Sequence, residues 1–275
     1  ALLGDISAVV GRLLDVLGKV DRDDAAASGT AEWLKVCSEK KLEWLALRKA
    51  RTEGAPMDDP AWGRSVLTQP SAIATVQTFA DEIGALKVFD AGDVQANGFQ
   101  INADRTPFQT ITESGASYMG FAGSALLSAA AADDPRYMIA FSGDGSFMMN
   151  PQILVDAAVH KAHAMVVVFD NRRMGAISSL QMAQYHHDFG TNDDVAVDFV
   201  AMANAVSGVK GVFGGYSVAE LKTALREAYA HEGLSLVHVP VFWGEVPMAG
   251  MGAYGRWNVG PWVEEVEKAY ASQAV

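Results

Sequence analysis

Cysteine is nearly absent from this sequence, which has one cysteine, Cys37, in 275 residues. A single cysteine cannot form an internal disulfide and cannot by itself hold a zinc ion, so disulfide-stapled scaffolds and cysteine-zinc modules are excluded. Basic residues are also scarce, since Lys and Arg total 21 against 33 Asp and Glu. A net acidic surface repels phosphate backbones and anionic lipid headgroups. We therefore expect neither nucleic acid nor a membrane as a partner.

Long apolar runs are missing as well. No stretch reaches the roughly eighteen apolar residues that a membrane-spanning helix needs, and the first five residues lack the cationic region of a secretory signal. The expected location is the cytoplasm. Half of the residues are hydrophobic, so a chain of this length can bury a substantial core, as one large domain or as one domain with an appendage.

Residues 1–62 are expected to form a helical appendage and a linker. Apolar residues at helical spacing predict an amphipathic helix over residues 1–20 and a second helix from Thr30 to about Arg51. Gly and Pro residues then stop the helix, so residues 54–60 are interpreted as a linker.

Residues 63–275 are expected to form the main domain, because short apolar runs alternate there with helical stretches. This alternation predicts an α/β fold with a doubly wound, mostly parallel sheet and helices on both faces. Ligands of such sheets bind at the carboxyl ends of the strands. The expected strands are Lys87–Phe89, Tyr137–Phe141, Met165–Phe169 and Leu234–Val239, and the expected helices are Ser71–Ile83, Met119–Ala132, Pro151–His160, Val218–Ala230 and Trp262–Tyr270.

One acidic residue, Asp144, lies between two glycines at the predicted carboxyl end of a strand. Glycines let backbone N–H groups approach phosphate oxygens, and the helix that follows offers its N-terminal dipole to the same anion. A carboxylate would repel a diphosphate unless a cation lay between them, so Asp144 indicates Mg²⁺, which prefers oxygen ligands. The next predicted strand ends in Asp170-Asn171, which makes Asn171 the natural second ligand.

A Gly-Asp-Gly turn alone is more often ordinary turn chemistry. Paired with Asp-Asn one helix and one strand later, it resembles the signature of the thiamine-diphosphate (ThDP) enzyme family, whose cofactors are ThDP and Mg²⁺. The resemblance implies that Asp144, Asn171 and the carbonyl of Arg173 bind Mg²⁺. It also implies that the cofactor is held by Gly143, Asp144, Gly145, Ser146, Asn171, Arg173, Met174 and Gly175.

The segment from Glu113 to Phe121 resembles the part of acetolactate-synthase-like members that supports the aminopyrimidine ring. The resemblance places Ser117, Tyr118 and Met119 at the cofactor. Met119 is then the wedge that holds the two rings in a bent, near-attack conformation, and the carbonyl of Ser117 accepts a hydrogen bond from the ring's amino group. The alternative is that Met119 is an ordinary core residue.

Gly92, Asp93 and Val94 follow the first strand of the predicted main domain, and the resemblance to the family places a further diphosphate-binding turn there. Asp93 stands where a neutral residue is more usual in the family. The competing interpretation is a solvated turn.

The resemblance covers about residues 65 to 270 and includes no pyrimidine-binding domain, which in the family carries the Glu that activates the cofactor; Glu113 is not its equivalent. We therefore expect a partner polypeptide, or an upstream part of the same gene product, to supply that domain, and a small carbonyl compound as substrate. Taken together, the segments 113–121, 170–171, 180–182, 189–191 and 256–260 look most like the trihydroxycyclohexanedione hydrolase branch and its cyclohexane-1,2-dione hydrolase relatives. The segment 184–188 departs from that pattern, which leaves the substrate open.

Candidate acid-base residues are His186 and His187, because imidazole titrates near neutrality. The alternative is that both are exposed loop residues. Gln181 is a candidate donor to a substrate oxygen or a residue packed within a helix, and Trp257 with Asn258 forms either a closing flap or an anchor for the C-terminus.

The expected function is an enzyme that makes or breaks a C–C bond next to a carbonyl, in a 2-oxo acid or a 1,2-dione. The alternatives are simple 2-oxo acid decarboxylation and a non-catalytic module that retains the fold. A Mg²⁺ phosphohydrolase is set aside, because Asp144 lacks a second carboxylate two residues later.

Overall fold

The computed structural model describes residues 4–19, 24–191, 195–243 and 268. The chain divides into two compact units, Ala1–Leu47 and Arg48–Val275. The boundary lies earlier in the chain than the expected one after residue 62. Residues 48–62 therefore belong to the main unit.

The first unit is helical, as predicted. Helix α1 (Ile6–Leu17) begins at Asp5, whose carboxylate accepts a hydrogen bond from the Ala8 N–H at 3.0 Å and so caps the first turn. Helix α2 (Asp24–Thr52) continues across the boundary into the second unit. A search of the described helices for one with the length and apolarity of a membrane span finds none.

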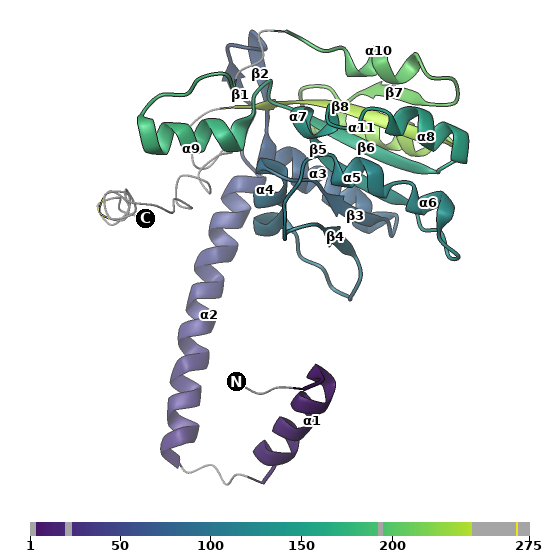
Figure 1. Ribbon diagram of the computed structural model, residues 1–275. Helices are drawn as coiled ribbons and strands as arrows, with labels where there is room; N and C mark the ends of the chain where they lie inside the picture. The colour runs from purple at the N-terminus through teal and green to yellow at the C-terminus, as the bar shows by residue number, and fades with distance from the viewer. Residues whose placement is uncertain (1–3, 20–23, 192–194, 244–267, 269–275) are drawn as a thin grey trace. The chain divides into compact units, whose positions relative to one another are not determined.

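The second unit is built on a sheet in the order β1-β2-β8-β6-β5-β3-β4, with β7 paired to β8 (Figure 1). All described pairings are parallel except β1 with β2. This confirms the predicted α/β fold. The strands are β1 (Met57–Asp59), β2 (Arg64–Thr68), β3 (Leu86–Phe89), β4 (Thr110–Thr112), β5 (Met138–Gly143), β6 (Ala164–Asp170), β7 (Lys210–Phe213) and β8 (Leu234–Phe242).

Helices cover both faces of this sheet, because alternate residues of the central strands point to opposite sides. In β5, Ile139 and Phe141 pack with α3 (Gln69–Glu82), α4 (Asp93–Ile101) and α11 (Val218–Tyr229), whereas Met138 and Ala140 pack with the helices of the other face. The other face carries α5 (Phe121–Ala125), α6 (Ser128–Ala131), α8 (Ile153–His160) and α10 (Phe199–Asn204). Helix α7 (Asp144–Phe147) follows β5 directly, and α9 (Gly175–Tyr185) follows β6 after the turn at residues 171–174.

Two expectations for this unit are wrong in part. The segment interpreted as a linker contains β1, which is fixed by antiparallel pairing with β2 and by Asp59, whose carboxylate accepts hydrogen bonds from the N–H groups of Ala61 and Trp243. The helix expected over Met119–Ala132 starts only at Phe121 and is interrupted between α5 and α6. Gly120 precedes it with φ at +92°, a left-handed conformation that ends helical geometry. The helix expected at Trp262–Tyr270 lies outside the described residues.

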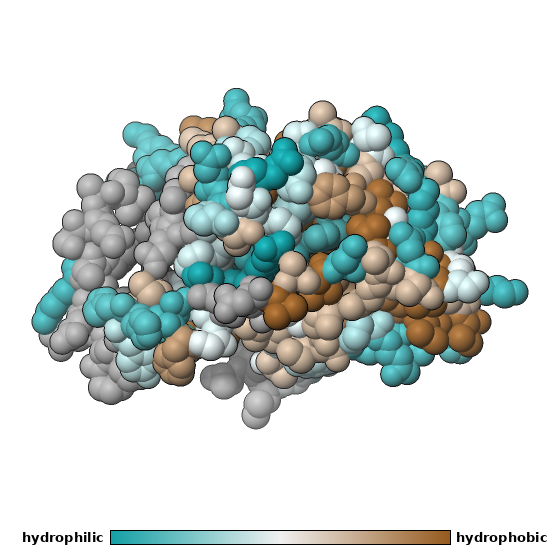
Figure 2. Space-filling model, turned by 90° about the horizontal axis from the view of Figure 1, so that it is seen from above, coloured by the Kyte–Doolittle hydropathy of each residue, from teal (hydrophilic) through white to brown (hydrophobic). Residues whose placement is uncertain are grey.

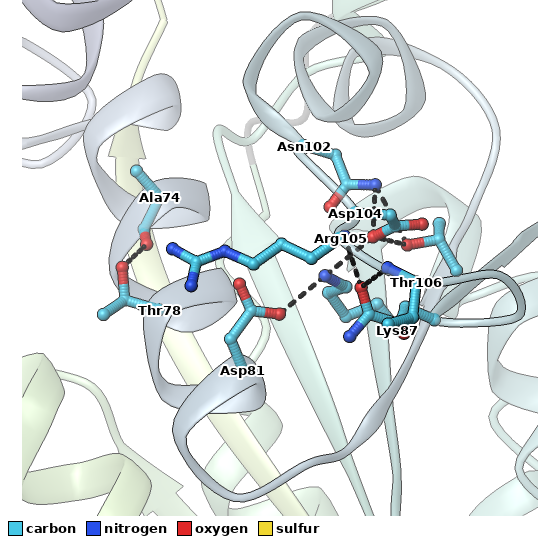
Figure 3. A network of polar contacts seen from close by, with 10 residues as sticks. Ala74, Thr78, Asp81, Lys87, Asn102, Asp104, Arg105 and Thr106 are labelled. Carbon is cyan, nitrogen blue, oxygen red and sulfur yellow. Dashed lines mark hydrogen bonds and ion pairs between the residues drawn. The ribbon is translucent and has the colours of Figure 1, made fainter.

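An ion network around the buried side chain of Lys87 fixes the start of β3 (Figure 3). The side chain of Lys87 is fully buried. Its Nζ lies 2.7 Å from Oδ1 of Asp81, near the end of α3, and 3.0 Å from Oδ1 of Asp104, in the loop after α4. A buried ammonium is tolerated only when paired. The network therefore holds two chain segments to β3, whose other end carries the candidate site.

Candidate functional site

The candidate site lies where β3, β5 and β6 end. These strands are parallel neighbours, and Gly143 of β5 is in register with Phe169 of β6. Asp144 and Asn171, which follow the two strands, therefore lie at the same edge of the sheet and line one cavity of about 240 Å³. The cavity is also lined by Gln69, Ala91, Gly92, Asp93, Val94, Ser117, Met119, Gly143, Gly145, Ser146, Phe169, Arg173, Met174, Gly175, Ala176, Ile177 and Leu180.

The two predicted metal ligands are both nearly buried, with 9% and 7% of Asp144 and Asn171 exposed. Oδ1 of Asp144 accepts a hydrogen bond from the Gly145 N–H at 2.9 Å, and Oδ1 of Asn171 accepts one from the Arg173 N–H at 3.0 Å. A carboxylate or amide oxygen has two lone pairs, so an oxygen that accepts one N–H can in principle also bind a cation. One carboxylate and one amide that face a common cavity fit the oxygen donors that Mg²⁺ prefers.

Two glycines of the cavity wall are packed closely against neighbouring side chains. A Cβ on Gly145 would lie 3.0 Å from Met174 Sδ and 3.3 Å from Met119 Cε. A Cβ on Gly175 would overlap sterically with Asp93 Oδ2. Glycine is therefore the residue that fits at these positions without displacing the neighbours, and a wall of backbone without Cβ atoms suits a phosphate cradle.

Asp93 is a buried residue in the first turn of α4, so the interpretation as a solvated turn is wrong. Its Oδ2 accepts a hydrogen bond from Asn171 Nδ2 at 3.3 Å, whereas its Oδ1 has no partner among the other described residues. Burial raises the pKa of Asp93 to about 7. The carboxyl is therefore partly protonated near neutrality, which reduces its repulsion of an anion in the cavity.

The loop before Gly120 is shaped by Glu113. Its carboxylate accepts hydrogen bonds from the N–H groups of Gly115 at 2.7 Å, Ala116 at 2.9 Å and Ser117 at 2.6 Å. These hydrogen bonds hold the pKa of Glu113 below its ordinary value, and the bond from Ala116 has the largest effect. Ser117, with φ at +52°, and Met119 both line the cavity. The predicted contact residue Tyr118 is not among the lining residues; it is 54% exposed, and its ring packs edge-on against Phe121.

Asp90 is a buried residue of the site that the sequence reasoning missed. Its Oδ1 accepts a hydrogen bond from the Gly120 N–H at 2.9 Å, and its Oδ2 accepts one from the Ser142 hydroxyl at 2.7 Å. Burial raises its pKa against the opposing effect of these bonds. Asp90 thereby joins the ends of β3 and β5 to the loop that carries Met119. An acidic residue directly after a buried strand is the signal that could have indicated it.

The turn that carries Asn171 is fixed by contacts of its two neighbours in the chain, Asp170 and Arg172. Asp170 Oδ2 lies 2.8 Å from Nε2 of His238, and both side chains are buried. Oδ1 of the same carboxylate accepts a hydrogen bond from the Arg172 N–H at 2.9 Å. Arg172 has φ at +53°, and its guanidinium lies over the ring of Trp62 at 4.0 Å. These contacts fix the backbone on which Asn171 and Arg173 are presented.

The candidate acid-base residues lie apart from the lining of the cavity. His186 and His187 are exposed at the end of α9. Gln181 is half-buried, and its Oε1 accepts a hydrogen bond from the Phe189 N–H at 2.9 Å. Their catalytic roles stay predictions. Trp257 and Asn258 lie outside the described residues.

Three comparisons with known proteins agree with this geometry. Residues 90–239 match the family model "Thiamine pyrophosphate enzyme, C-terminal TPP binding domain". The chain is 31% identical over 224 residues to a 3D-(3,5/4)-trihydroxycyclohexane-1,2-dione hydrolase of Bacillus cereus, covering 76% of this chain and 33% of that protein. A relative of the same name from Bacillus subtilis is 28% identical over 218 residues, covering 75% and 33%. The chain thus spans about a third of the length of these relatives.

Solved structures show the same fold. A thiamine diphosphate-dependent 4-hydroxybenzoylformate decarboxylase from Rhodococcus jostii superposes with a TM-score of 0.59 at 21% identity, covering 70% of this chain and 35% of that one. Benzoylformate decarboxylase from Polynucleobacter necessarius gives 0.55 at 21% identity, covering 62% and 32%. At this level of identity the likeness concerns the fold.

Proposed function

We propose a function for this chain, which belongs to the thiamine pyrophosphate enzyme family because its residues 90–239 match the C-terminal TPP-binding domain. In this proposal the chain is the ThDP- and Mg²⁺-binding part of an enzyme that makes or breaks a C–C bond next to a carbonyl. The observation that carries this proposal is the placement of Asp144 and Asn171 at adjacent strand ends around one cavity with a glycine-lined wall.

The metal is held by Asp144, Asn171 and the carbonyl of Arg173 in this proposal. Among the described residues there is no group of three or more His, Cys, Asp or Glu side chains that could hold a metal ion. A site with one carboxylate leaves most of the coordination sphere of Mg²⁺ to other oxygens, which a diphosphate supplies. Metal and cofactor are therefore expected to bind together.

The chain's own residues position the cofactor, which supplies a carbanion that adds to carbonyl groups when it is bound. Met119 lies in the cavity wall beside Gly145, where its side chain can hold the two rings in a bent conformation. The carbonyl of Ser117 orients the amino group of the pyrimidine. Asp90 fixes this loop to β3, so the wedge keeps its place relative to Asp144.

A pyrimidine-binding domain completes the site in this proposal and carries the activating Glu. The chain spans a third of the length of its relatives, which leaves room in them for that domain. Exposed apolar residues lie in the chain segment from the end of the Asp144 motif through α8, namely Met148, Met149, Val155 and Val159. Figure 2 shows apolar surface gathered over the part of the second unit that carries α8 in Figure 1. An exposed apolar surface of this kind suits a protein–protein contact.

The substrate class in this proposal is a 1,2-dione or a 2-oxo acid. Relatives that are named for hydrolysis of a 1,2-dione favour the dione. Decarboxylation of a 2-oxo acid is the alternative, and the metal-diphosphate site serves either reaction. A non-catalytic module would have no need of Asp144, Asn171 and the two close-approach glycines, which argues against that third possibility.

Calorimetry tests the proposal. ThDP is titrated into the full chain with Mg²⁺, with EDTA, and with Mg²⁺ plus a pyrimidine-binding domain from a related enzyme. We expect saturable binding that requires Mg²⁺ and that is lost in Asp144→Ala, because the metal loses its charged ligand. Absence of binding in every sample would overturn the proposal.

A further inference from the structure

Gln69 is a lining residue of the cavity that belongs to none of the cofactor motifs. It is the first residue of α3, directly after β2, and only 3% of it is exposed. Thr68 caps this helix through its hydroxyl, which accepts a hydrogen bond from the Ser71 N–H. The position of Gln69 is therefore set by a helix start and not by a mobile loop.

Two buried neighbours determine which end of the Gln69 amide faces the cavity. Nη2 of Arg51 donates a hydrogen bond to Oδ1 of Asn97 at 2.6 Å. A guanidinium has only donors, so it must meet the oxygen of the Asn97 amide and not the nitrogen. Nδ2 of Asn97 is thereby turned toward Gln69, where it donates to Oε1.

The oxygen of Gln69 is thus used within the protein, and this is the one hydrogen bond of its side chain within the described part of the chain. Its Nε2, with two N–H donors, is left for the cavity. Two other donors of the lining are at least partly used: one N–H of Asn171 Nδ2 donates to Asp93, and the hydroxyl of Ser117 donates to Gln95. A diphosphate in this cavity needs donors, and Gln69 has them free.

We propose that Nε2 of Gln69 donates a hydrogen bond to a phosphate oxygen of the bound cofactor, and that Arg51 and Asn97 are positioning residues that hold the Gln69 amide in that orientation. The inference rests on the proposed function. It adds to the site a hydrogen-bond donor from outside the family motifs. It also adds a relay of hydrogen bonds from Arg51, near the end of α2, through Asn97 to Gln69.

The test measures the affinity of the full chain for Mg²⁺-pyrophosphate and for Mg²⁺-ThDP by calorimetry, with the thermal unfolding of the ligand-free chain as a check of folding. Gln69→Glu keeps the shape of the side chain but replaces the donor by an oxygen. We expect it to weaken the binding of both probes at least tenfold. Pyrophosphate has no rings, so an equal loss for both probes places the contact at the phosphates.

Asn97→Asp tests the same donor without altering Gln69. A carboxylate at position 97 can only accept, so it would receive bonds from both Arg51 and Gln69, and Gln69 would turn its oxygen toward the cavity. We expect a loss of affinity in the same direction as for Gln69→Glu. Gln100→Glu is the matched control, because Oε1 of Gln100 also accepts from Arg51 and the substitution adds the same charge beside the same guanidinium without turning Gln69.

The outcomes separate this inference from the proposed function. If Asp144→Ala loses binding while Gln69→Glu and Asn97→Asp bind as tightly as the unaltered chain, the donor role of Gln69 is overturned and the metal site stands. If Asn97→Asp behaves like Gln100→Glu, the relay is overturned. If Asp144→Ala also binds normally, the proposed function itself fails.

Discussion

The carboxylate of Asp90 accepts a hydrogen bond of 2.9 Å from the N–H of Gly120, and this bond ties the residue after Met119 to the end of β3. The other oxygen of Asp90 accepts the hydroxyl of Ser142, the residue before Gly143. One buried side chain thus sets the distance between the loop that carries the proposed wedge and the loop that carries the proposed metal ligand. Both loops should be affected together when it is changed.

Asp90→Asn should lower the free energy of unfolding by about 1–3 kcal/mol, because an amide nitrogen in place of one oxygen leaves a buried donor facing a donor. It should also weaken cofactor binding, since Met119 and Asp144 lose their common anchor. Urea unfolding and calorimetry measure the two effects. Ser142→Ala removes only one of the bonds and should cost less; an equal or larger cost would contradict the anchoring role.

Met119→Ala should leave Mg²⁺-dependent ThDP binding nearly unchanged but slow the exchange of the C2 proton of the cofactor in the complete enzyme. The metal and diphosphate contacts stay, whereas the ring geometry that brings the pyrimidine nitrogen to C2 is lost. Proton exchange followed by NMR measures the rate. Phe108→Ala, which truncates a side chain that is 84% exposed and does not line the cavity, is the control, and an unaltered exchange rate in Met119→Ala would refute the wedge.

Gly175→Ala should destabilise the ligand-free chain by about 1–3 kcal/mol through overpacking, because its Cβ would overlap with Asp93 Oδ2. The double variant with Asp93→Ala should recover much of this loss, since the overlapping atom is removed. Gly11→Ala is the control, at a helix position where nothing lies within 4 Å of the added atom. Equal costs of Gly175→Ala with and without Asp93 would show that the overlap is not the cause.

The contribution of Asp93 to the stability of the metal-free chain should fall as pH rises from about 4 to about 7. The pKa of Asp93 is raised to about 7 by burial, above its ordinary value of 3.8, so the folded state binds the proton more tightly than the unfolded state. Its favourable contribution is complete below the ordinary value and is lost as pH passes through 7. The slope from this group is at most about 1.4 kcal/mol per pH unit.

Urea unfolding in EDTA at pH 5 and pH 8 checks this dependence. Asp93→Asn cannot ionise, so it should lose less stability between the two values than the unaltered chain. Identical pH dependence in the two proteins would show that Asp93 is not the group responsible.

Much of the sheet could be predicted from the sequence, because β3, β5, β6 and β8 are short apolar runs buried on both faces. The adjacency of Asp144 and Asn171 followed from the same pattern, since parallel neighbours end at one edge. The strands β1, β2, β4 and β7 were missed. They are partly exposed and lack a long continuous apolar run, so their sequences carry no distinct signal.

The contacts that orient the site could not be predicted, because they join residues far apart in the chain. Arg51, Gln69 and Asn97 come from three helices and meet only in the folded protein. Asp93 looked like a turn residue, and only the packing of α4 against β3 and β5 shows that it is buried. Local patterns give the motif residues; the choice of donor or acceptor at each depends on tertiary neighbours.

The position of β8 has a consequence for the order of folding. It is the last described strand, yet it pairs with β6 on one side and with β7 and β2 on the other. Among the described strands, β8 alone pairs the β1–β2 hairpin with the rest of the sheet. During synthesis, a nascent chain that has emerged only to residue 233 lacks β8, the strand that pairs with β2, β6 and β7. The sheet therefore cannot form completely until nearly the entire domain has left the ribosome.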